Sequence, residues 1–273
     1  MKPTGTVSTT QDEPQRGDWR TAGRGWGTRA VEWAYLFEPY AGPANDILFE
    51  ELGVGVGIRH LDVACGSGLA ANTAHRRGAS VSGLDASAGL IEIARARTPG
   101  GDFRIGDMFD LPFEDNTFDT VTSFNGIWNG CEGALREVQR VLAVDGRFGM
   151  TYWGAYDRMG LLPYFLAVIE HSPESHRTAT IDIGDTSNVV EDILNATDFV
   201  IETSGTVEVV NEWPDVSTAV RALAAAGPSI PAIESVGYDD FCATLRDVVA
   251  PMHDPRVGVR ISSEFGWITA RPR

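Results

Sequence analysis

Hydrophobic and polar positions between residues 58 and 153 alternate between short apolar runs and longer stretches with helical spacing. The apolar runs predict strands at 58–63, 80–84, 102–105, 118–123 and 147–153, and the stretches between them predict helices at 69–77, 87–96 and 131–143. Gly146 is predicted to stop the last of these helices. Strands that alternate with helices are typical of a parallel sheet covered on both faces. The pattern therefore predicts an α/β fold with a doubly wound, mostly parallel sheet.

The flanking segments follow other patterns. Residues 1–18 are polar and predict a flexible tail, whereas 19–57 space apolar residues at helical intervals around Pro39 and Gly42-Pro43 and predict two cover helices. Further helices are expected at 161–171 and 189–199, and strands at 199–210 and 257–270. We expect a core at 58–212, a small helical cap inserted at 213–256, and the final strand of the core at 257–273.

Composition and charge narrow the classes of partner. The formal net charge of -16 over 273 residues disfavours a nucleic-acid substrate and an anionic membrane surface. No stretch approaches the roughly 20 apolar residues of a membrane span. The cysteines Cys65, Cys131 and Cys242 are widely separated, which predicts neither a disulfide framework nor a metal site and suits a reducing, cytoplasmic location. The oligomeric state stays open, with a homodimer as one possibility.

A glycine-rich turn follows the first predicted strand. Residues 66–71 read GSGLAA, which fits the G-x-G-x-x-G/A spacing of dinucleotide-binding loops. Without a Cβ at Gly66 and Gly68, the backbone is able to approach a ligand closely. Taken alone, this turn fits a nicotinamide dinucleotide as well as another nucleoside-bearing cofactor.

Two acids lie near the turn, and one of them distinguishes between these cofactors. Asp85 ends the second strand, where an acid is the expected acceptor for the two ribose hydroxyls of either cofactor. Asp62 lies within the end of the first strand, and a carboxylate there would oppose binding of a pyrophosphate. The same charge favours the sulfonium and ammonium groups of S-adenosylmethionine.

A third acid follows the third strand. Asp107 is placed to accept a hydrogen bond from an adenine amino group, and Met108, Phe109 and Leu90 are candidates to sandwich the base. The alternative is that Asp107 caps a turn while the apolar side chains fill the core.

Several strings together resemble a known family. "LDVACGSG", "LDAS", "GDMFDLPFEDNTFDTVTS" and "EVQRVLAVDGRF" are similar to successive motifs of class I S-adenosylmethionine-dependent methyltransferases, especially the ubiquinone and menaquinone biosynthesis branch, over residues 58–153. The resemblance implies a Rossmann-like seven-stranded sheet whose last strand is antiparallel. It also implies methyl transfer from S-adenosylmethionine, with S-adenosylhomocysteine as the product. We expect O-, N- or C-methylation of a small acceptor, and the aromatic residues named below favour a hydrophobic or aromatic metabolite. Val144-Asp145 stands where many relatives have proline and glycine, which affects a surface loop.

The resemblance also assigns cofactor-binding residues. Those expected at the methionine part are Asp62, Ala64, Cys65, Gly66, Ser67 and Gly68; those at the ribose are Asp85, Ala86 and Ser87; those at the adenine are Leu90, Gly106, Asp107, Met108 and Phe109. Asn125 and Gly126 are expected to face the methyl group and its acceptor.

The acceptor side is less specific. Methyl transfer is an in-line displacement, so a general base is needed only for some acceptors, and His171 and His176 are the candidates. Trp33, Tyr40, Trp128 and Tyr164 are predicted to line the acceptor pocket. For all six, ordinary packing or surface placement is the competing interpretation.

Two other functions stay open on the sequence alone. A nicotinamide-dependent oxidoreductase would use the same glycine turn, but it leaves Asp62 and Asp107 unexplained and no Tyr-x-x-x-Lys pair serves it. A non-catalytic module that binds S-adenosylmethionine is the third hypothesis, because methyltransferases have no obligatory catalytic signature.

Overall fold

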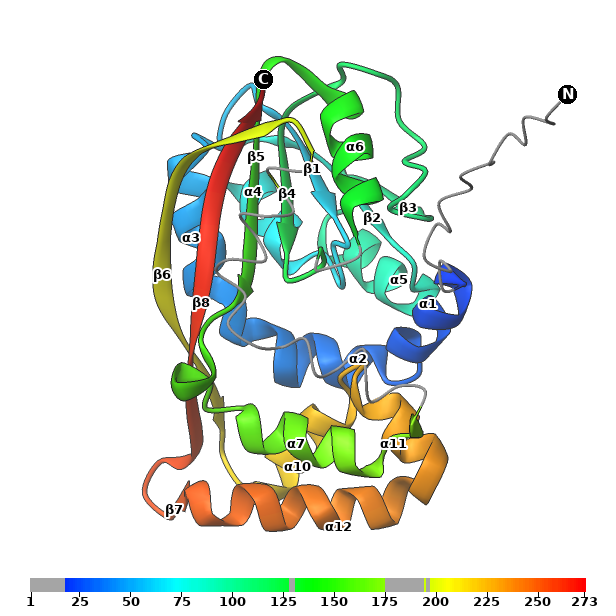
Figure 1. Ribbon diagram of the computed structural model, residues 1–273, viewed down its shortest axis with the longest axis vertical. Coiled ribbons are helices and arrows are strands. Elements are labelled where there is room, and N and C mark those ends of the chain that lie inside the picture. The colour runs from blue at the N-terminus through cyan, green and yellow to red at the C-terminus, as the bar shows by residue number, and fades with distance from the viewer. Residues whose placement is uncertain (1–17, 128–130, 175–193, 195–196) are drawn as a thin grey trace, which may run out of the picture.

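A single twisted sheet organises the chain, and Figure 1 shows it in the computed structural model, which describes residues 18–127, 131–174, 194 and 197–273. Its strand order is β3-β2-β1-β4-β5-β8-β6, and a two-residue β7 (His253–Asp254) pairs with β8. The strands on this path are β1 (Arg59–Val63), β2 (Ser80–Asp85), β3 (Asp102–Ile105), β4 (Phe118–Phe124), β5 (Leu142–Trp153), β6 (Phe199–Trp213) and β8 (Gly258–Pro272). Neighbouring pairs among β1 to β5 are parallel, whereas β8 is antiparallel to both β5 and β6. The predicted doubly wound, mostly parallel sheet with an antiparallel last strand is confirmed, and β7 makes the sheet eight-stranded, one strand more than the predicted seven.

Helices cover both faces of this sheet. The helices of the core are α3 (Gly42–Glu51), α4 (Leu69–Arg76), α5 (Ala88–Arg97) and α6 (Glu132–Val141). Leu61 of β1 belongs to the same hydrophobic core as Leu135 of α6, while the neighbouring His60 lies edge-on to Phe49 of α3. Because successive side chains of a strand point to opposite faces, this alternation shows that β1 is covered on both sides.

The junction between α6 and β5 differs from the prediction. The helix ends at Val141, and β5 starts at Leu142 rather than at residue 147, before Gly146 is reached. Leu142 is extended, with φ -67° and ψ 133°, because it pairs with Phe118 of β4. Asp145 takes the left-handed conformation, with φ 66°, within the extended segment. Strand pairing therefore overrides the local helical pattern here.

The N-terminal part is more broken than the two predicted helices. Asp18, the one described residue of the predicted tail, caps α1 (Trp19–Gly27) by accepting a hydrogen bond from the Arg20 amide. Then come α2 (Ala30–Glu32), a π-helix η1 (Trp33–Phe37) and a 3-10 helix η2 (Glu38–Ala41), which leads into α3. We call residues 19–41 the cover segment.

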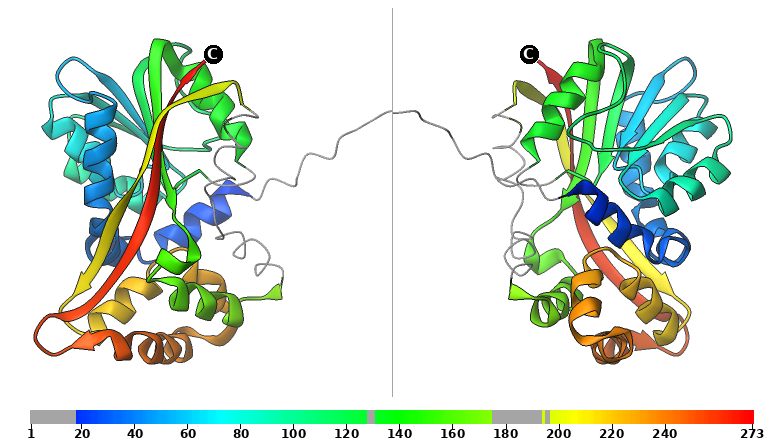
Figure 2. Two further views of the ribbon diagram at one scale, coloured as in Figure 1. Left: turned by 60° about the vertical axis from the view of Figure 1, so that its left-hand side comes forward. Right: turned by 90° about the vertical axis from the view of Figure 1, so that its right-hand side faces the viewer.

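The cap consists of two chain segments. The predicted insertion supplies α10 (Val216–Ala224), α11 (Ser229–Val236), α12 (Tyr238–Val249) and the short η4 (Ala250–Met252). The preceding α7 (Leu162–His171), which follows a short η3 (Tyr156–Arg158), shares one hydrophobic core with them, which the boundaries drawn from the sequence did not include. Figure 2 shows the long β6 and β8 strands running from the sheet to this cap.

No single described helix is long and apolar enough to cross a membrane. The consecutive helices α10 and α11 have sufficient length and apolar character only when taken together, and they are bent by 97° relative to each other.

The cover segment lies between the sheet and the cap (Figure 1). On the cap side, Glu32 pairs with Arg221 at 2.9 Å, and the Trp213 indole nitrogen donates to the Leu36 carbonyl at 2.6 Å. On the core side, a Cβ added to Gly23 would lie 2.0 Å from the Ala86 carbonyl oxygen, so α1 rests directly on the residue after β2. The segment is thus held from both sides.

Phe265 of β8 joins these layers, so its truncation should destabilise the protein. Its ring is fully buried and lies 4.8 Å from the Trp153 ring and 5.5 Å from the Tyr40 ring, centroid to centroid. We expect Phe265→Ala to lower the free energy of unfolding by about 3 to 5 kcal/mol in denaturant titrations. Val144→Ala, at a side chain that is 84% exposed, is the control and should change it by less than about 0.5 kcal/mol. Equal effects of the two substitutions would contradict this packing.

Candidate functional site

The glycine turn connects β1 to α4 in a left-handed conformation. Ala64, Gly66 and Gly68 have φ values of 58°, 55° and 73°. A Cβ on Gly66 would lie 2.7 Å from Trp33 Cη2, and one on Gly68 would lie 2.7 Å from the Ala94 Cβ. The sequence analysis attributed the missing Cβ atoms to close approach of a ligand. In the structure, the same positions are filled by the cover segment and by α5.

Asp85 ties this turn to the end of β2. One carboxylate oxygen accepts from the Gly66 amide at 2.9 Å, and the other accepts from the Ser87 amide at 2.8 Å. A carboxylate oxygen has two lone pairs, so each oxygen keeps capacity for a further donor. Burial raises the pKa of Asp85, and these backbone hydrogen bonds oppose that rise. The predicted ribose acceptor is therefore also a structural part of the loop.

Asp62 is the most deeply buried acid of the site. Its side chain is 1% exposed, Oδ1 accepts from the Thr122 hydroxyl at 3.1 Å, and the buried Oδ2 has no hydrogen-bond partner among the described residues. Burial raises the pKa of Asp62 to about 8, the Thr122 hydrogen bond opposes the rise, and the charges of Glu38 and Asp85 add to it. Such an oxygen calls for a cation or a donor from a ligand.

His60 lies two residues before Asp62 in β1. Its ring nitrogens contact the hydroxyls of Thr120 at 2.9 Å and Thr122 at 3.2 Å, and burial lowers the pKa of His60 to about 3. The imidazole is therefore neutral near pH 7 and supplies no charge to balance Asp62. In the described ranges, no group of three or more His, Cys, Asp or Glu side chains is arranged to hold a metal ion.

Glu38 and Arg97 were not among the predicted site residues. Glu38 of the cover segment accepts from the Ser67 amide at 3.1 Å, from the Ser67 hydroxyl, and from the Arg97 guanidinium at 2.6 Å. Burial raises the pKa of Glu38, while Ser67 and Arg97 oppose the rise. The two side chains are 59 positions apart in the chain, so no local pattern pairs them.

The residues expected at the adenine surround the tip of β3. Asp107 Oδ1 accepts from the Phe109 amide at 3.0 Å, which is the turn-capping role that the sequence left open, and the Gly106 amide donates to the Asp85 carbonyl at 3.1 Å. Met108 and Phe109 are partly buried against the hydrophobic core of the sheet, and Leu90 is buried. Their role toward a base stays a prediction.

Asn125 follows β4 and meets the cover segment. It has a φ of 53°, and its Oδ1 accepts from the Thr151 hydroxyl at 3.2 Å. Burial raises the pKa of Tyr40, and a hydrogen bond with the Asn125 side chain opposes that rise. A Cβ on Gly126 would lie 2.5 Å from the Ala64 Cβ, so the loops after β1 and β4 touch. The predicted methyl-facing pair therefore lies beside the glycine turn.

The candidate bases are not brought to this loop by any described contact. His171 ends α7, where Nδ1 contacts the Ala167 carbonyl at 2.9 Å and Nε2 contacts the Thr244 hydroxyl at 3.4 Å. Its ring lies beside Phe241 of α12, so its contacts favour the packing role within the cap. His176 lies outside the described residues.

The aromatic residues that were predicted to line the acceptor pocket lie in different parts of the structure. Trp33 covers Gly66, and Tyr40 stacks on Trp153 with 6.2 Å between ring centroids. Tyr164 is buried inside the cap, where its hydroxyl meets that of Ser229 at 2.9 Å, so it fills the cap core rather than a pocket. Trp128 lies outside the described residues.

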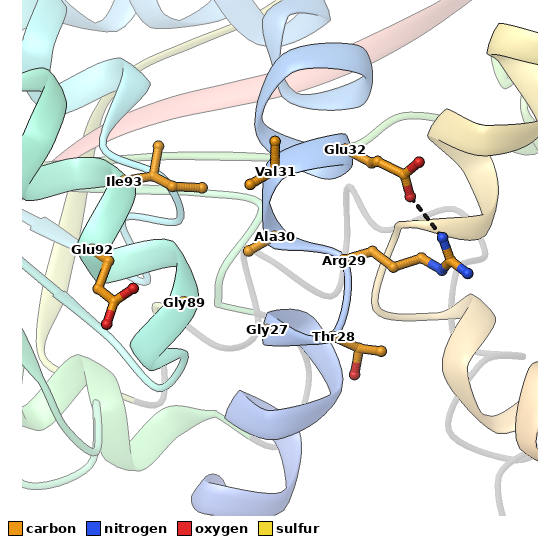
Figure 3. A pocket seen from close by; sticks show the side chains of 9 residues that line it. All are labelled: Gly27, Thr28, Arg29, Ala30, Val31, Glu32, Gly89, Glu92 and Ile93. Atoms are coloured by element: carbon orange, nitrogen blue, oxygen red, sulfur yellow. Dashed lines mark hydrogen bonds and ion pairs between the residues drawn. The ribbon is translucent and has the colours of Figure 1, made fainter.

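Two open clefts flank the cover segment. The first, of about 510 Å³, lies between the 27–32 stretch of the chain and α5 residues Gly89, Glu92 and Ile93 (Figure 3). The second, of about 480 Å³, lies between α1 and a wall that includes Ala86 and Ile105. Neither cleft is lined by Asp62 or by a residue of the turn at 64–68, because the cover segment lies over that turn.

Comparison with known proteins identifies the part of the chain that holds this site. Residues 61–150 match a family model described as a methyltransferase domain. The demethylmenaquinone methyltransferase of Renibacterium salmoninarum is 38% identical over 103 residues, which are 37% of this chain and 44% of that protein. The chain thus spans less than half the length of this relative.

Solved structures show a similar fold over more of the chain. The [4+2]-cyclase SpnF has a TM-score of 0.61 at 20% identity, with 94% of this chain and 97% of that chain covered. A geranyl diphosphate C-methyltransferase from Streptomyces coelicolor, solved with S-adenosyl-L-homocysteine, has a TM-score of 0.50 at 16% identity, with 85% and 76% covered. At these identities the likeness concerns the fold.

The burial of Asp62 predicts a pH-dependent effect of its removal. An acid whose pKa is raised from 3.8 to about 8 on folding contributes stability below its unfolded pKa and loses it as the pH rises through the folded value. Asn retains an acceptor for Thr122 without the charge. We therefore expect Asp62→Asn to raise the thermal midpoint of the ligand-free protein relative to wild type, by an amount that grows between pH 5 and 8.

Asp119→Asn is the matched control, because Arg59 lowers the pKa of Asp119 and this pair stabilises the ionised form. Its midpoint should fall relative to wild type over the same pH range. A constant offset for Asp62→Asn at every pH would contradict the shifted ionisation.

Proposed function

We propose that this chain, whose residues 61–150 form a class I S-adenosylmethionine-dependent methyltransferase domain related to the menaquinone and ubiquinone branch, transfers a methyl group from that cofactor to a small molecule. The observation that carries the proposal is the buried Asp62 carboxylate oxygen without a partner among the described residues, next to the glycine turn.

The charges around the turn fit S-adenosylmethionine. The charges of Glu38 and Asp85 raise the pKa of Asp62, and the charges of all three acids raise the pKa of Cys65 in the turn. Of these acids, Glu38 forms an ion pair with Arg97. The cofactor carries a sulfonium and an ammonium group, which an unpaired carboxylate stabilises. A pyrophosphate would instead meet like charges, so the nicotinamide-dependent alternative is not favoured.

Different residues of the site are proposed to hold different parts of the cofactor. The turn at 64–68 and Asp62 are proposed to hold the methionine part, and the spare lone pairs of Asp85 accept from the ribose hydroxyls. The backbone around Gly106 and Asp107 lies next to Asp85 and is proposed to meet the adenine. When bound, the cofactor supplies a methyl group that is electrophilic because it is attached to a positively charged sulfur.

The acceptor side is proposed to lie at Tyr40 and Asn125. The Asn125 side chain opposes the burial-driven rise in the pKa of Tyr40, so the two side chains interact next to the loop after β4, and Tyr40 belongs to an aromatic group with Trp153 and Phe265. An amide and a phenol within aromatic surroundings suit a hydrophobic or aromatic acceptor with one polar group. The relative from Renibacterium salmoninarum is a demethylmenaquinone methyltransferase, but the match to the family model ends at residue 150, before the cap begins.

Calorimetry with S-adenosylhomocysteine and with NAD tests the cofactor. We expect binding of S-adenosylhomocysteine and none of NAD; the reverse result would overturn the proposal. Transfer is then tested with methyl-labelled cofactor, a demethylmenaquinone analogue and an extract of small metabolites. Label in a solvent-extractable product is expected, whereas intact cofactor binding without any transfer would favour a non-catalytic binding module.

The ribose assignment predicts the effect of Asp85→Asn. This variant retains one neutral acceptor but loses the charge-assisted hydrogen bonds, which contribute about 1.5 to 3 kcal/mol. We expect the dissociation constant for S-adenosylhomocysteine to rise by at least about tenfold in calorimetry. Asp119→Asn, which alters a carboxylate at the start of β4, is the control and should leave it unchanged. Unchanged affinity in Asp85→Asn would show that the ribose lies elsewhere.

The acceptor assignment predicts that Tyr40→Phe separates binding from transfer. The ring and its stacking on Trp153 are kept, while the hydroxyl that meets Asn125 is lost. With an identified acceptor, we expect kcat to fall by about tenfold or more while affinity for S-adenosylhomocysteine stays within about twofold. Tyr156→Phe, at a tyrosine that is 38% exposed on η3, is the control. Loss of cofactor affinity in parallel with kcat would count against an acceptor role.

A further inference from the structure

Arg97 connects three parts of the chain. From the end of α5 its guanidinium donates to Glu38 at 2.6 Å, to the Ala34 carbonyl at 2.9 Å and to the Ser67 carbonyl at 3.2 Å. The Arg97 side chain is 15% exposed and that of Glu38 is 10% exposed. A planar guanidinium with several donors is suited to hold such separate acceptors in one geometry.

Ser67 is held at both its backbone groups. Its amide donates to Glu38 and its carbonyl accepts from Arg97, in the middle of the turn between the left-handed Gly66 and Gly68. Trp33, which precedes Glu38 in the same cover segment, lies against Gly66. The ion pair therefore fixes the register between the cover segment and the turn that is proposed to hold the cofactor.

A partly buried ion pair adds little net stability, because desolvation offsets the attraction between the charges. Loss of either partner nevertheless leaves the other charge buried without a counter-charge and weakens the contact it held. The geometry of this pair is thus better suited to specify one closed arrangement than to stabilise the fold as a whole.

We propose that Glu38 and Arg97 are positioning residues that lock the cover segment onto Ser67 and thereby slow the release of bound cofactor. This inference rests on the proposed function, because it takes the 64–68 turn as the place where the cofactor is held. Because the cover segment lies over the turn, a ligand held by the turn would leave when the segment lifts, and the ion pair resists that movement.

A positioning role of the Glu38–Arg97 pair, called the lock below, and a simple charge effect predict different dissociation rates. S-adenosylmethionine and S-adenosylhomocysteine differ by the methyl group and its positive charge. If the pair acts as a lock, Glu38→Gln and Arg97→Met both raise the dissociation rates of both ligands by about tenfold, and by the same factor for each ligand. If Glu38 only attracts the sulfonium, Glu38→Gln accelerates release of S-adenosylmethionine alone, and Arg97→Met slows it.

Stopped-flow displacement of each ligand measures these rates. Asp46→Asn, which breaks the ion pair of α3 with Arg77 outside the turn, is the matched acid-to-amide control and should leave them within about twofold. Arg97→Lys retains the charge but loses the planar donor set, so it should accelerate release of both ligands less than Arg97→Met does. This milder variant serves as the test if Arg97→Met fails to fold.

Amide hydrogen exchange on the ligand-free protein tests the lock independently of the cofactor. Exchange at Ser67 and in residues 19–41 should accelerate in Glu38→Gln and stay unchanged in Asp46→Asn. Unchanged exchange would overturn the lock itself, and accelerated exchange with unchanged release of both ligands would overturn its role in cofactor retention. If the wild-type protein binds neither ligand, the proposed function fails and the retention role fails with it, whereas the exchange result still reports the lock.

Discussion

The buried carboxylate of Asp62 lies near the end of β1, a strand that is flanked by β2 and β4 and covered on both faces. The described residues supply no hydrogen-bond partner to its second oxygen. Burial therefore works against its ionisation in the ligand-free protein. A neutral side chain would suit the ligand-free fold better, so this carboxylate is a local conflict of the kind that marks functional sites. The surrounding loops are arranged around it, since Asp85 fixes the turn after β1 and the loop after β4 packs against that turn.

The cover segment gives this site its outer wall. Its side chains occupy the Cβ position missing at Gly66 and reach Ser67 through Glu38, while its other side is bound to the cap through Glu32 and Leu36. Glycine at position 66 therefore serves protein packing as well as any approach of a ligand. In the proposed arrangement, the contacts that close the segment over the turn would also slow the release of a bound cofactor, so the fold and the proposed function share the same contacts.

The match to the family model concerns the core and stops before the cap. The matched family model covers the sheet from β1 to β5 and ends before α7, whereas the cap combines α7 with the α10–α12 insertion at the far end of the long β6 and β8 strands. The cap residue Tyr164 shows the limit of reading acceptor sites from aromatic composition, because its hydroxyl is used inside the cap core.

The order of strands and helices in the core, the glycine turn and the acids at the strand ends follow from the amino-acid sequence, because hydrophobic periodicity and turn chemistry act over a few residues. Which distant groups meet depends on the packing of whole elements. Glu38 and Arg97 pair because η2 and α5 dock on the same turn, and β5 begins at Leu142 because that residue pairs with Phe118. Likewise, α7 joins the cap through side chains that lie far from the insertion in the chain. Such contacts depend on how whole elements pack, and no local pattern records them.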